Sequence, residues 1–182
     1  MKRFVTLAVI LMLAVPAGWL LAQSVSLART TTAPKLDGAM SAKEYSYTLQ
    51  EPSMQLGMSW VGDTLYVAVT GQTTGWVAVG LGSPRMDGAV LYLGFVADGK
   101  GQMKVQQGTG HRHGDTNSDA PTQFALKEAD GQTTMELALK ADSFLALNQT
   151  RLDVILAYGS APSFNSLHRA HFATTVDVTP GS

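Results

Sequence analysis

Two short apolar runs joined by a polar turn constrain this chain more than any other feature. Residues 76–81 are aliphatic or small after an initial tryptophan, and residues 89–96 are almost wholly apolar. Turn residues bound both runs, at Ser83-Pro84-Arg85 and at Asp98-Gly99. Runs this short, bounded by turns and rich in β-branched residues, indicate strands buried on both faces rather than helices.

The rest of the chain repeats this pattern of short strands and turns. Candidate hairpins turn at Gly62-Asp63, at residues 98–101 and at Asp130-Gly131, with strand-forming residues on both sides. Residues 142–148 are expected to form a short helical turn or a loop, and residues 108–121 a long polar loop. About nine or ten short strands with almost no helix predict an all-β, antiparallel β-sandwich.

The N-terminus has the pattern of a targeting segment. Lys2-Arg3 precedes an apolar stretch that continues to Leu21, so residues 1–22 are interpreted as a cleaved signal peptide. The alternative is an uncleaved membrane anchor, which Pro16 and Gly18 disfavour because they interrupt the stretch. Residues 23–34 are expected to form a flexible leader and residues 35–182 the folded domain. A periplasmic or secreted protein follows, without stable membrane insertion after cleavage.

Composition excludes several classes of protein. The chain has no cysteine, so it has neither disulfides nor a C-x-x-C-H motif for covalent haem attachment. Removal of Lys2 and Arg3 with the signal lowers Lys+Arg from 13 to 11 against 14 Asp+Glu, and the net charge from −1 to −3. With no basic run, nucleic-acid binding is not expected. No nucleophile–base pair, G-x-S-x-G elbow or H-E-x-x-H motif is present, so a carrier or binding module is expected rather than an enzyme.

Met86 stands in the polar turn between the two central runs. One interpretation is a methionine that folds back to fill a gap at the end of the sandwich. The other is a soft thioether ligand for a metal or for haem iron.

The four histidines lie at the ends of predicted strands or in loops, at His111, His113, His168 and His171. They are either solvated loop residues or ligands. With Met86, one histidine would complete a haem pocket suited to electron transfer. Alternatively, the H-x-H and H-x-x-H pairs with Met86 would form a copper or zinc site.

Two stretches resemble DOMON domains. One is Gly75-Trp76-Val77-Ala78-Val79-Gly80-Leu81, followed by Met86-Asp87-Gly88-Ala89 and a strand that ends Phe95-Val96-Ala97-Asp98-Gly99. The other is the apolar run 152–159, then Leu167-His168 and the closing Val176-Asp177-Val178. The opening Leu36-Asp37-Gly38 also fits, so the resemblance covers nearly all of the chain after the signal.

The resemblance implies an immunoglobulin-like β-sandwich that binds b-type haem or sugars. Cytochrome-type members, such as the domain of cellobiose dehydrogenase, use a methionine and a histidine as axial ligands, which match Met86 and His168. In many bacterial relatives an Arg-Gly pair follows that histidine, whereas Ala170-His171-Phe172 occupies the corresponding region here. Many relatives are fused to a membrane b-type cytochrome, so a separate redox partner, either a dehydrogenase or such a cytochrome, is expected.

The hypothesis from the sequence is therefore an exported domain that binds haem b non-covalently through Met86 and His168 and transfers electrons. Strand parity predicts that His168 points into the sandwich with Phe172 and that His171 points outward. Arg112 or Arg169 is expected to pair with a haem propionate. The pocket edge is expected to comprise Trp76, Arg85, His111, Arg112, His113, Arg169 and His171.

Two alternatives remain open at this stage. One is a non-redox module that binds a sugar or another small ligand on the same sandwich, and the other is a periplasmic copper-binding protein. Trp60 and Trp76 lie in predicted strands rather than on an exposed platform, which disfavours sugar binding.

Overall fold

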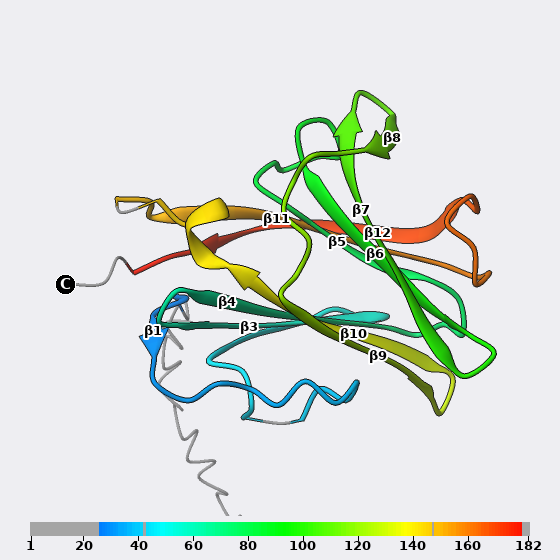
Figure 1. Cartoon of the computed structure of the whole chain (residues 1–182), viewed down its shortest axis with the longest axis horizontal. Coiled ribbons are helices and arrows are strands. Elements are labelled where there is room, and N and C mark those ends of the chain that lie inside the picture. Colours follow the sequence, from blue (N-terminus) through cyan, green and yellow to red (C-terminus); the bar gives the residue numbers. More distant parts are fainter. Residues whose placement is uncertain (1–25, 42, 147, 180–182) are drawn as a thin grey trace, which may run out of the picture.

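The chain folds into a sandwich of two six-stranded β-sheets, shown one above the other in Figure 1. This computed structural model describes residues 26–41, 43–146 and 148–179. The predicted signal peptide lies outside the described residues. The prediction of an all-β, largely antiparallel sandwich is confirmed. The described part of the chain contains no helix that could span a bilayer.

The first sheet has the strand order β1-β3-β4-β10-β9, and β2 also pairs with β3. Its strands are β1 (Arg29–Thr30), β2 (Tyr47–Gln50), β3 (Met54–Val61), β4 (Thr64–Gly71), β9 (Gln123–Ala129) and β10 (Gln132–Lys140). The second sheet has the order β12-β11-β5-β6-β7-β8. Its strands are β5 (Val77–Leu81), β6 (Val90–Ala97), β7 (Lys100–Thr109), β8 (Arg112–Asp115), β11 (Arg151–Gly159) and β12 (His168–Asp177). A single 3-10 turn, η1 (Ala141–Ser143), lies in the region for which a short helical turn or loop was predicted.

The main core fills the space between the sheets with alternate residues of their strands. Leu56 and Met58 of β3 meet Leu137 of β10, while Tyr92 of β6 and Leu156 of β11 enter from the second sheet; all five are at most 1% exposed. Burying a side chain of this size stabilises the fold by about 1.5–3 kcal/mol. This alternation fixes the register, because a one-residue slip would turn every core residue outward.

The predicted hairpin turns at Asp98-Gly99 and Asp130-Gly131 are confirmed. Both residues of each pair have positive φ, at 50° and 71° in the first turn and 54° and 75° in the second. Two-residue turns with positive φ match the right-handed twist of the flanking strands, and Asp-Gly tolerates this conformation best.

Part of the leader predicted over residues 23–34 is paired with the sandwich. Leu27 is completely buried in the main core and bridges Val178, while Arg29 and Thr30 pair in parallel with Trp60 and Val61. One apolar side chain and a few backbone hydrogen bonds suffice to hold this segment against the edge of the first sheet.

The long loop predicted over residues 108–121 is also shorter than expected. Strand β7 continues to Thr109, and Arg112–Asp115 form β8, which pairs back onto β7. His113 therefore lies in a strand, and His111 lies in the turn that precedes it. A polar hairpin exposed on both faces has no apolar alternation, so its sequence does not distinguish it from a loop.

The outer face of the first sheet is covered by residues 34–41 and 43–46, a segment that we call the strap. A Cβ added to Gly57 of β3 would lie 2.7 Å from the ring of Tyr45 and 3.0 Å from the sulfur of Met40, so the strap packs directly on this strand. On this outer face four polar residues are at most 7% exposed, namely Ser59, Thr70, Thr134 and Glu136, and the small Ala68 and Ala138 are also buried.

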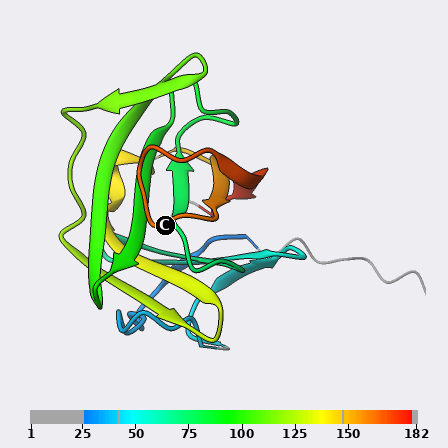
Figure 2. The ribbon, with the colours of Figure 1, turned by 90° about the vertical axis from the view of Figure 1, so that its right-hand side faces the viewer.

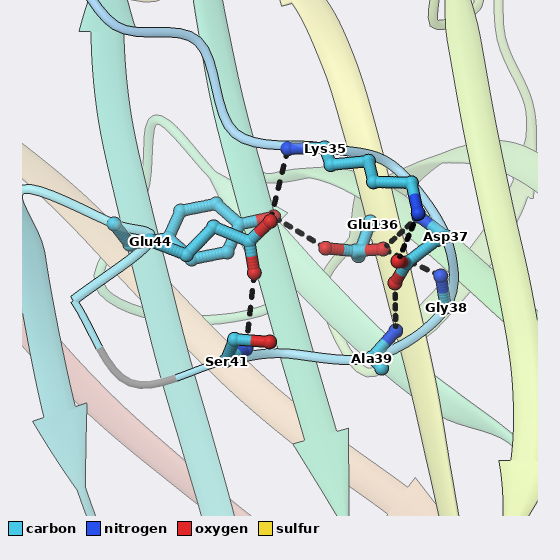
Figure 3. Close-up of polar contacts among 8 residues, drawn as sticks. Lys35, Asp37, Gly38, Ala39, Ser41, Glu44 and Glu136 are labelled. Carbon is cyan, nitrogen blue, oxygen red and sulfur yellow. Dashed lines mark hydrogen bonds and ion pairs between the residues drawn. The ribbon is translucent and has the colours of Figure 1, made fainter.

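Glu136 of β10 holds the strap in place (Figure 3). Its carboxylate accepts hydrogen bonds from the backbone N–H groups of Asp37 (2.8 Å) and Gly38 (2.6 Å) and from the hydroxyl of Tyr45 (2.7 Å). Burial raises the pKa of Glu136, although these three donors oppose the shift. The Leu36-Asp37-Gly38 opening is therefore a docking segment for one buried carboxylate.

Candidate functional site

The outer face of the second sheet carries a second apolar cluster, which we call the outer cluster. Val77, Val79 and Leu81 of β5 point into the main core, so the residues between them point away from it. The outer cluster consists of Trp76, Ala78, Ala89, Leu91, Leu93 and Phe95, with Met86, Ala97, Ile155, Ala157 and Phe164 packed against it. The prediction that β5 and β6 are buried on both faces is confirmed for all of β5 and for most of β6.

Strand pairing places His171 on this outer face. A row of paired residues crosses the sheet, consisting of His171, Ala157, Ala78, Leu93 and Lys104. The outward orientation predicted for His171 is therefore correct. On β12 the residues of this face are mostly exposed, whereas on β5 and β6 the same face is apolar and buried.

The predicted inward orientation of His168 is wrong. The pairing of β11 with β12 shifts between Tyr158 and Gly159, so His168 rather than Arg169 lies opposite Gly159. This β-bulge inserts one extra residue and reverses the phase of the strand. His168 is exposed, and its ring lies edge-on to that of His171 with 5.0 Å between centroids. Both imidazoles therefore border the outer cluster.

Met86 reaches the outer cluster from the turn between β5 and β6. The turn docks on β7, where Gly88 N–H donates to the carbonyl of Gly108 (3.1 Å) and Gly108 N–H donates to that of Ala89 (2.9 Å). A Cβ added to Gly108 would collide with the backbone carbonyl of Met86. Glycine at this position lets the turn lie on the strand, and the half-buried Met86 side chain then packs on the cluster.

The loop between β11 and β12 covers the other part of the cluster. The indole N–H of Trp76 donates to Ser166 Oγ (2.8 Å), and the hydroxyl of Ser166 donates to the carbonyl of Ser163 (3.1 Å). These two hydrogen bonds hold the loop so that Phe164 packs on Phe95 of β6, with 4.6 Å between ring centroids. The sequence interpretation missed Phe164, and the available signal was a single aromatic residue in an otherwise polar loop.

The other predicted residues of the pocket edge do not gather with these. His111, Arg112 and His113 lie at the β7–β8 hairpin, on the edge of the sheet opposite β12; in Figure 2 the green hairpin is at the top, apart from the orange-red β12. His113 Nδ1 is 2.7 Å from Gln106 Oε1. Arg85 and Arg169 are exposed, whereas Trp76 is buried.

The four histidines therefore form two pairs on opposite edge strands. Six strands lie across the sheet, and neighbouring strands are about 4.8 Å apart, so a single site cannot collect both pairs. Among the described residues, no group of three or more histidine, aspartate or glutamate side chains could hold a metal ion. The structure gives no support to the copper or zinc site considered from the sequence.

The two described tryptophans do not form a sugar platform. Trp60 is 4% exposed and is covered by the guanidinium of Arg29, 4.2 Å from the ring centroid, while Trp76 is 6% exposed. Trp60 and Arg29 line a groove of about 510 Å³ beside the β3–β4 turn, with Asp63, Lys140 and Asp142 nearby. None of the residues predicted as ligands or pocket edge belongs to this groove.

The fold and the site together define a two-sheet β-sandwich domain whose second sheet has an apolar outer face bordered by one thioether and two imidazoles. The cytochrome domain of Myriococcum thermophilum cellobiose dehydrogenase has this fold, with a TM-score of 0.52 and 12% identity over 73% of this chain and 81% of that one. The cytochrome b domain of Coprinopsis cinerea pyranose dehydrogenase gives a TM-score of 0.51 and 11% identity over 68% and 76%.

A family 9 carbohydrate-binding module from Caldicellulosiruptor kristjanssonii, in complex with cellotriose, is also similar, with a TM-score of 0.49 and 11% identity over 86% of this chain and 94% of that one. No known protein-family profile matches the chain, and no curated protein matches it in sequence. The resemblance to DOMON-type cytochrome domains is confirmed at the level of the fold.

The donor types at this face are those that bind haem iron, but they do not lie together. Met86 lies over Gly108 of β7, beyond the end of β5, whereas His171 lies on β12, level with Ala78 near the start of β5. Neighbouring strands are about 4.8 Å apart, so the side chains of Met86 and either histidine do not reach one iron in this arrangement. Met/His ligation is one of the arrangements that proteins use for haem iron, and an apolar environment limits the access of water.

Proposed function

We propose that this protein is an exported, non-catalytic domain that binds one haem b non-covalently through Met86 and His168 and transfers single electrons. One observation supports the proposal: the sandwich has the fold of two cytochrome domains, and the second sheet has an apolar outer face with Met86 over β7 and two imidazoles on β12. The DOMON resemblance favours His168 over His171 as the axial histidine. When bound, haem supplies one-electron iron chemistry, and Met/His ligation raises its potential.

The residues of this chain have separate roles at the site. The outer cluster binds the apolar macrocycle and excludes water, much as it now packs against Met86 and Phe164. Gly108 holds the Met86 backbone on β7, so ligation of one iron by both Met86 and His168 requires the β5–β6 turn and the start of β12 to approach each other. The Trp76–Ser166 hydrogen bond fixes the loop two residues before His168 and thereby limits where its imidazole can lie.

Electron transfer requires a partner, and the two cytochrome domains of similar fold belong to dehydrogenases by name. We therefore propose a separate redox partner protein, either a dehydrogenase or a membrane b-type cytochrome. Residues 1–22 are proposed to direct export to the periplasm or the exterior.

The direct test is reconstitution with haem, followed by absorption spectroscopy. The expected result is about one haem per chain, with a Soret band and sharp α/β bands on reduction. Met86→Leu keeps the side-chain volume but removes the sulfur, and it should give a high-spin or altered spectrum while the fold is retained. Failure of haem to bind the wild-type protein, together with tight binding of copper or of an oligosaccharide, would replace this function by one of the alternatives.

A further inference from the structure

Strand β12 gives the sandwich its longest open edge. It has ten residues and ends the second sheet, with β11 on one side only. The edge strands β1, β2 and β8 have two, four and four residues. The seven-residue edge strand β9 packs against the second sheet, since a Cβ added to Gly94 of β6 or to Gly101 of β7 would lie 2.8 or 2.9 Å from Leu126. A long, uncovered edge is a template for pairing with another strand.

The backbone of β12 turns three residues toward this edge. The carbonyl of Asp177 accepts a hydrogen bond from Leu27 N–H (2.7 Å) on the side away from β11. Backbone groups of alternate residues in a strand point the same way, so the N–H and C=O groups of His171, Ala173 and Thr175 also face away from β11. The bridge of Leu27 closes the edge beyond Thr175. In the described part of the chain, the remainder of β12 pairs with β11 alone.

Apolar side chains accompany the open edge. Leu167, directly before β12, is 89% exposed, and it and Phe124 are the exposed large hydrophobic residues of the described part of the chain. Phe172 lies opposite Leu156 on the inner face of β12 and is half-buried against the main core. Unpaired backbone groups beside incompletely buried apolar side chains are features of a strand to which another strand can be added.

The two ends of the open edge carry opposite charges. Arg169 near its start and Asp177 at its end are both exposed, and neither forms an ion pair within the described residues. A second β12 in the antiparallel direction brings the Arg169 end of one copy to the Asp177 end of the other, whereas a parallel one would bring like charges together. The edge is therefore complementary to itself in the antiparallel direction.

We propose that β12 is a self-association surface, on which a second copy of this chain pairs antiparallel about a two-fold axis at Phe172. His171 of each copy then lies opposite Ala173 of the other, and each of these two pairs exchanges two backbone hydrogen bonds. The two Phe172 side chains meet at the axis as a non-hydrogen-bonded pair, the arrangement in which opposite side chains are closest. Arg169 is diagonal to Asp177 of the other copy. This inference does not depend on the proposed function.

Sedimentation equilibrium of the chain from Gln23 onward tests the pairing. The wild type should form a dimer with a Kd on the order of 10 µM, as expected for a small interface. Ala173→Pro removes an N–H group that faces the open edge and takes no hydrogen bond from β11, so it should raise the Kd about tenfold or more while the monomer stays folded. Ala173→Ser keeps the N–H group and should leave the Kd unchanged. Thermal unfolding of each dilute variant confirms the fold.

Two further substitutions test the direction of pairing and the apolar contact. Arg169→Asp places like charges together at both ends of the interface and should raise the Kd about tenfold, and the addition of Asp177→Arg should restore it. Leu167→Ser should raise the Kd severalfold, because the exposed leucine lies beside the end of the other copy's strand. Phe124→Ser is the matched control, since Phe124 is the exposed apolar residue of the first sheet, and it should change nothing.

Spin labels locate the contact. The chain has no cysteine, so each variant carries one label. Labels on Ala173→Cys should lie within about 20 Å of each other across the axis, whereas labels on Gly114→Cys of β8 should lie more than about 40 Å apart, because five strand spacings of about 4.8 Å separate β8 from β12 in each copy. A Cβ added to Gly114 meets no atom within 4 Å, so this position accepts the label.

The outcomes decide the inference without reference to haem. A wild type that stays monomeric up to about 200 µM, well above the Kd expected for a small interface, overturns it. A dimer that Ala173→Pro leaves intact, or in which the labels on β8 are the closer pair, also overturns it, since the contact then lies elsewhere. A dimer that Arg169→Asp weakens and the double variant does not restore overturns the antiparallel arrangement. Reconstitution with haem tests the proposed function separately.

Discussion

The outer faces of the two sheets are both covered, but by opposite means. On the first sheet, polar residues of β3, β4 and β10 lie beneath the strap, and Glu136 alone accepts three hydrogen bonds from it. On the second sheet the outward residues of β5 and β6 are apolar, and two loops contribute Met86 and Phe164, which pack against them. No buried side-chain nitrogen or oxygen in the described part of the chain lacks a hydrogen-bond partner.

This difference has a consequence for function. Removal of the strap would break three hydrogen bonds to Glu136 that each need a defined geometry. Displacement of Met86 and Phe164 from the outer cluster breaks contacts that have no fixed direction, and an apolar ligand would replace them. The first face is therefore closed by specific hydrogen bonds, whereas the second suits exchange of its own side chains for a ligand.

The largest effect is expected at the second face, from replacement of the axial histidine. His168→Ala should abolish the low-spin haem spectrum, because the iron loses an axial ligand. His171→Ala is the matched control: its ring lies 5.0 Å away on the same face, and it should keep the spectrum. Absorption and electron paramagnetic resonance spectra of the two reconstituted variants distinguish them. Loss of the spectrum only in His171→Ala would assign the ligand to His171 instead.

The next largest effect is expected at the first face and should leave haem binding intact. Glu136→Ala removes the acceptor of the backbone N–H groups of Asp37 and Gly38 and of the Tyr45 hydroxyl, and should lower the free energy of unfolding by about 3 kcal/mol. Urea unfolding of the apoprotein measures this loss, and the spectrum of the reconstituted variant shows whether the second face is affected. A normal stability would mean that the strap is held mainly by the packing of Tyr45 and Met40.

A smaller effect concerns pH. Burial raises the pKa of Glu136 above its ordinary value of 4.5, with Glu44 contributing and the three hydrogen-bond donors opposing. As the pH rises above 4.5, Glu136 loses its proton in the unfolded chain before it does so in the folded protein. The free energy of unfolding therefore falls with rising pH until the pKa of Glu136 in the folded protein is passed. The wild-type apoprotein should therefore lose stability over this interval.

Glu136→Gln provides the matched control for the pH effect. Its carboxamide oxygen can accept from Asp37 and Gly38 while its NH₂ group donates to Tyr45, so the stability should stay within about 1 kcal/mol of the wild type near neutral pH. Urea unfolding across the interval should then show a smaller dependence on pH. An equal dependence in wild type and variant would assign the titration to other groups.

The sequence predicts the central strands of the fold but not the details of the site. Strands β5 and β6 are predictable because both of their faces are apolar and turns bound them. The orientation of His168 depends on a bulge at Arg169, which no period in the sequence reveals. Phe164 lies in an irregular loop, and its contact with Phe95 depends on the hydrogen bond from the Trp76 indole to Ser166.

The sequence does not predict the docking of the strap, for a different reason. Glu136 occupies an outward position of β10, where a charged residue would ordinarily be solvated. Its partners Tyr45 and Gly38 lie 91 and 98 residues earlier in the chain. Local patterns cannot connect groups so far apart, although Leu36-Asp37-Gly38 by itself resembles the opening of a DOMON domain.

The smallest effect is expected from the arginines at the two edges of the second sheet. Arg112 and Arg169 are exposed, and they lie on β8 and β12 rather than against the outer cluster. Replacement of both by glutamine should therefore speed haem loss by about twofold or less, since exposed ion pairs contribute little and are screened by salt. The rate is measured with excess apomyoglobin at low and high ionic strength, beside the wild-type protein. If the double variant loses haem many times faster than the wild type at low salt, a carboxylate of the ligand points toward an edge of the sheet, and the second face is less enclosed than its packing indicates.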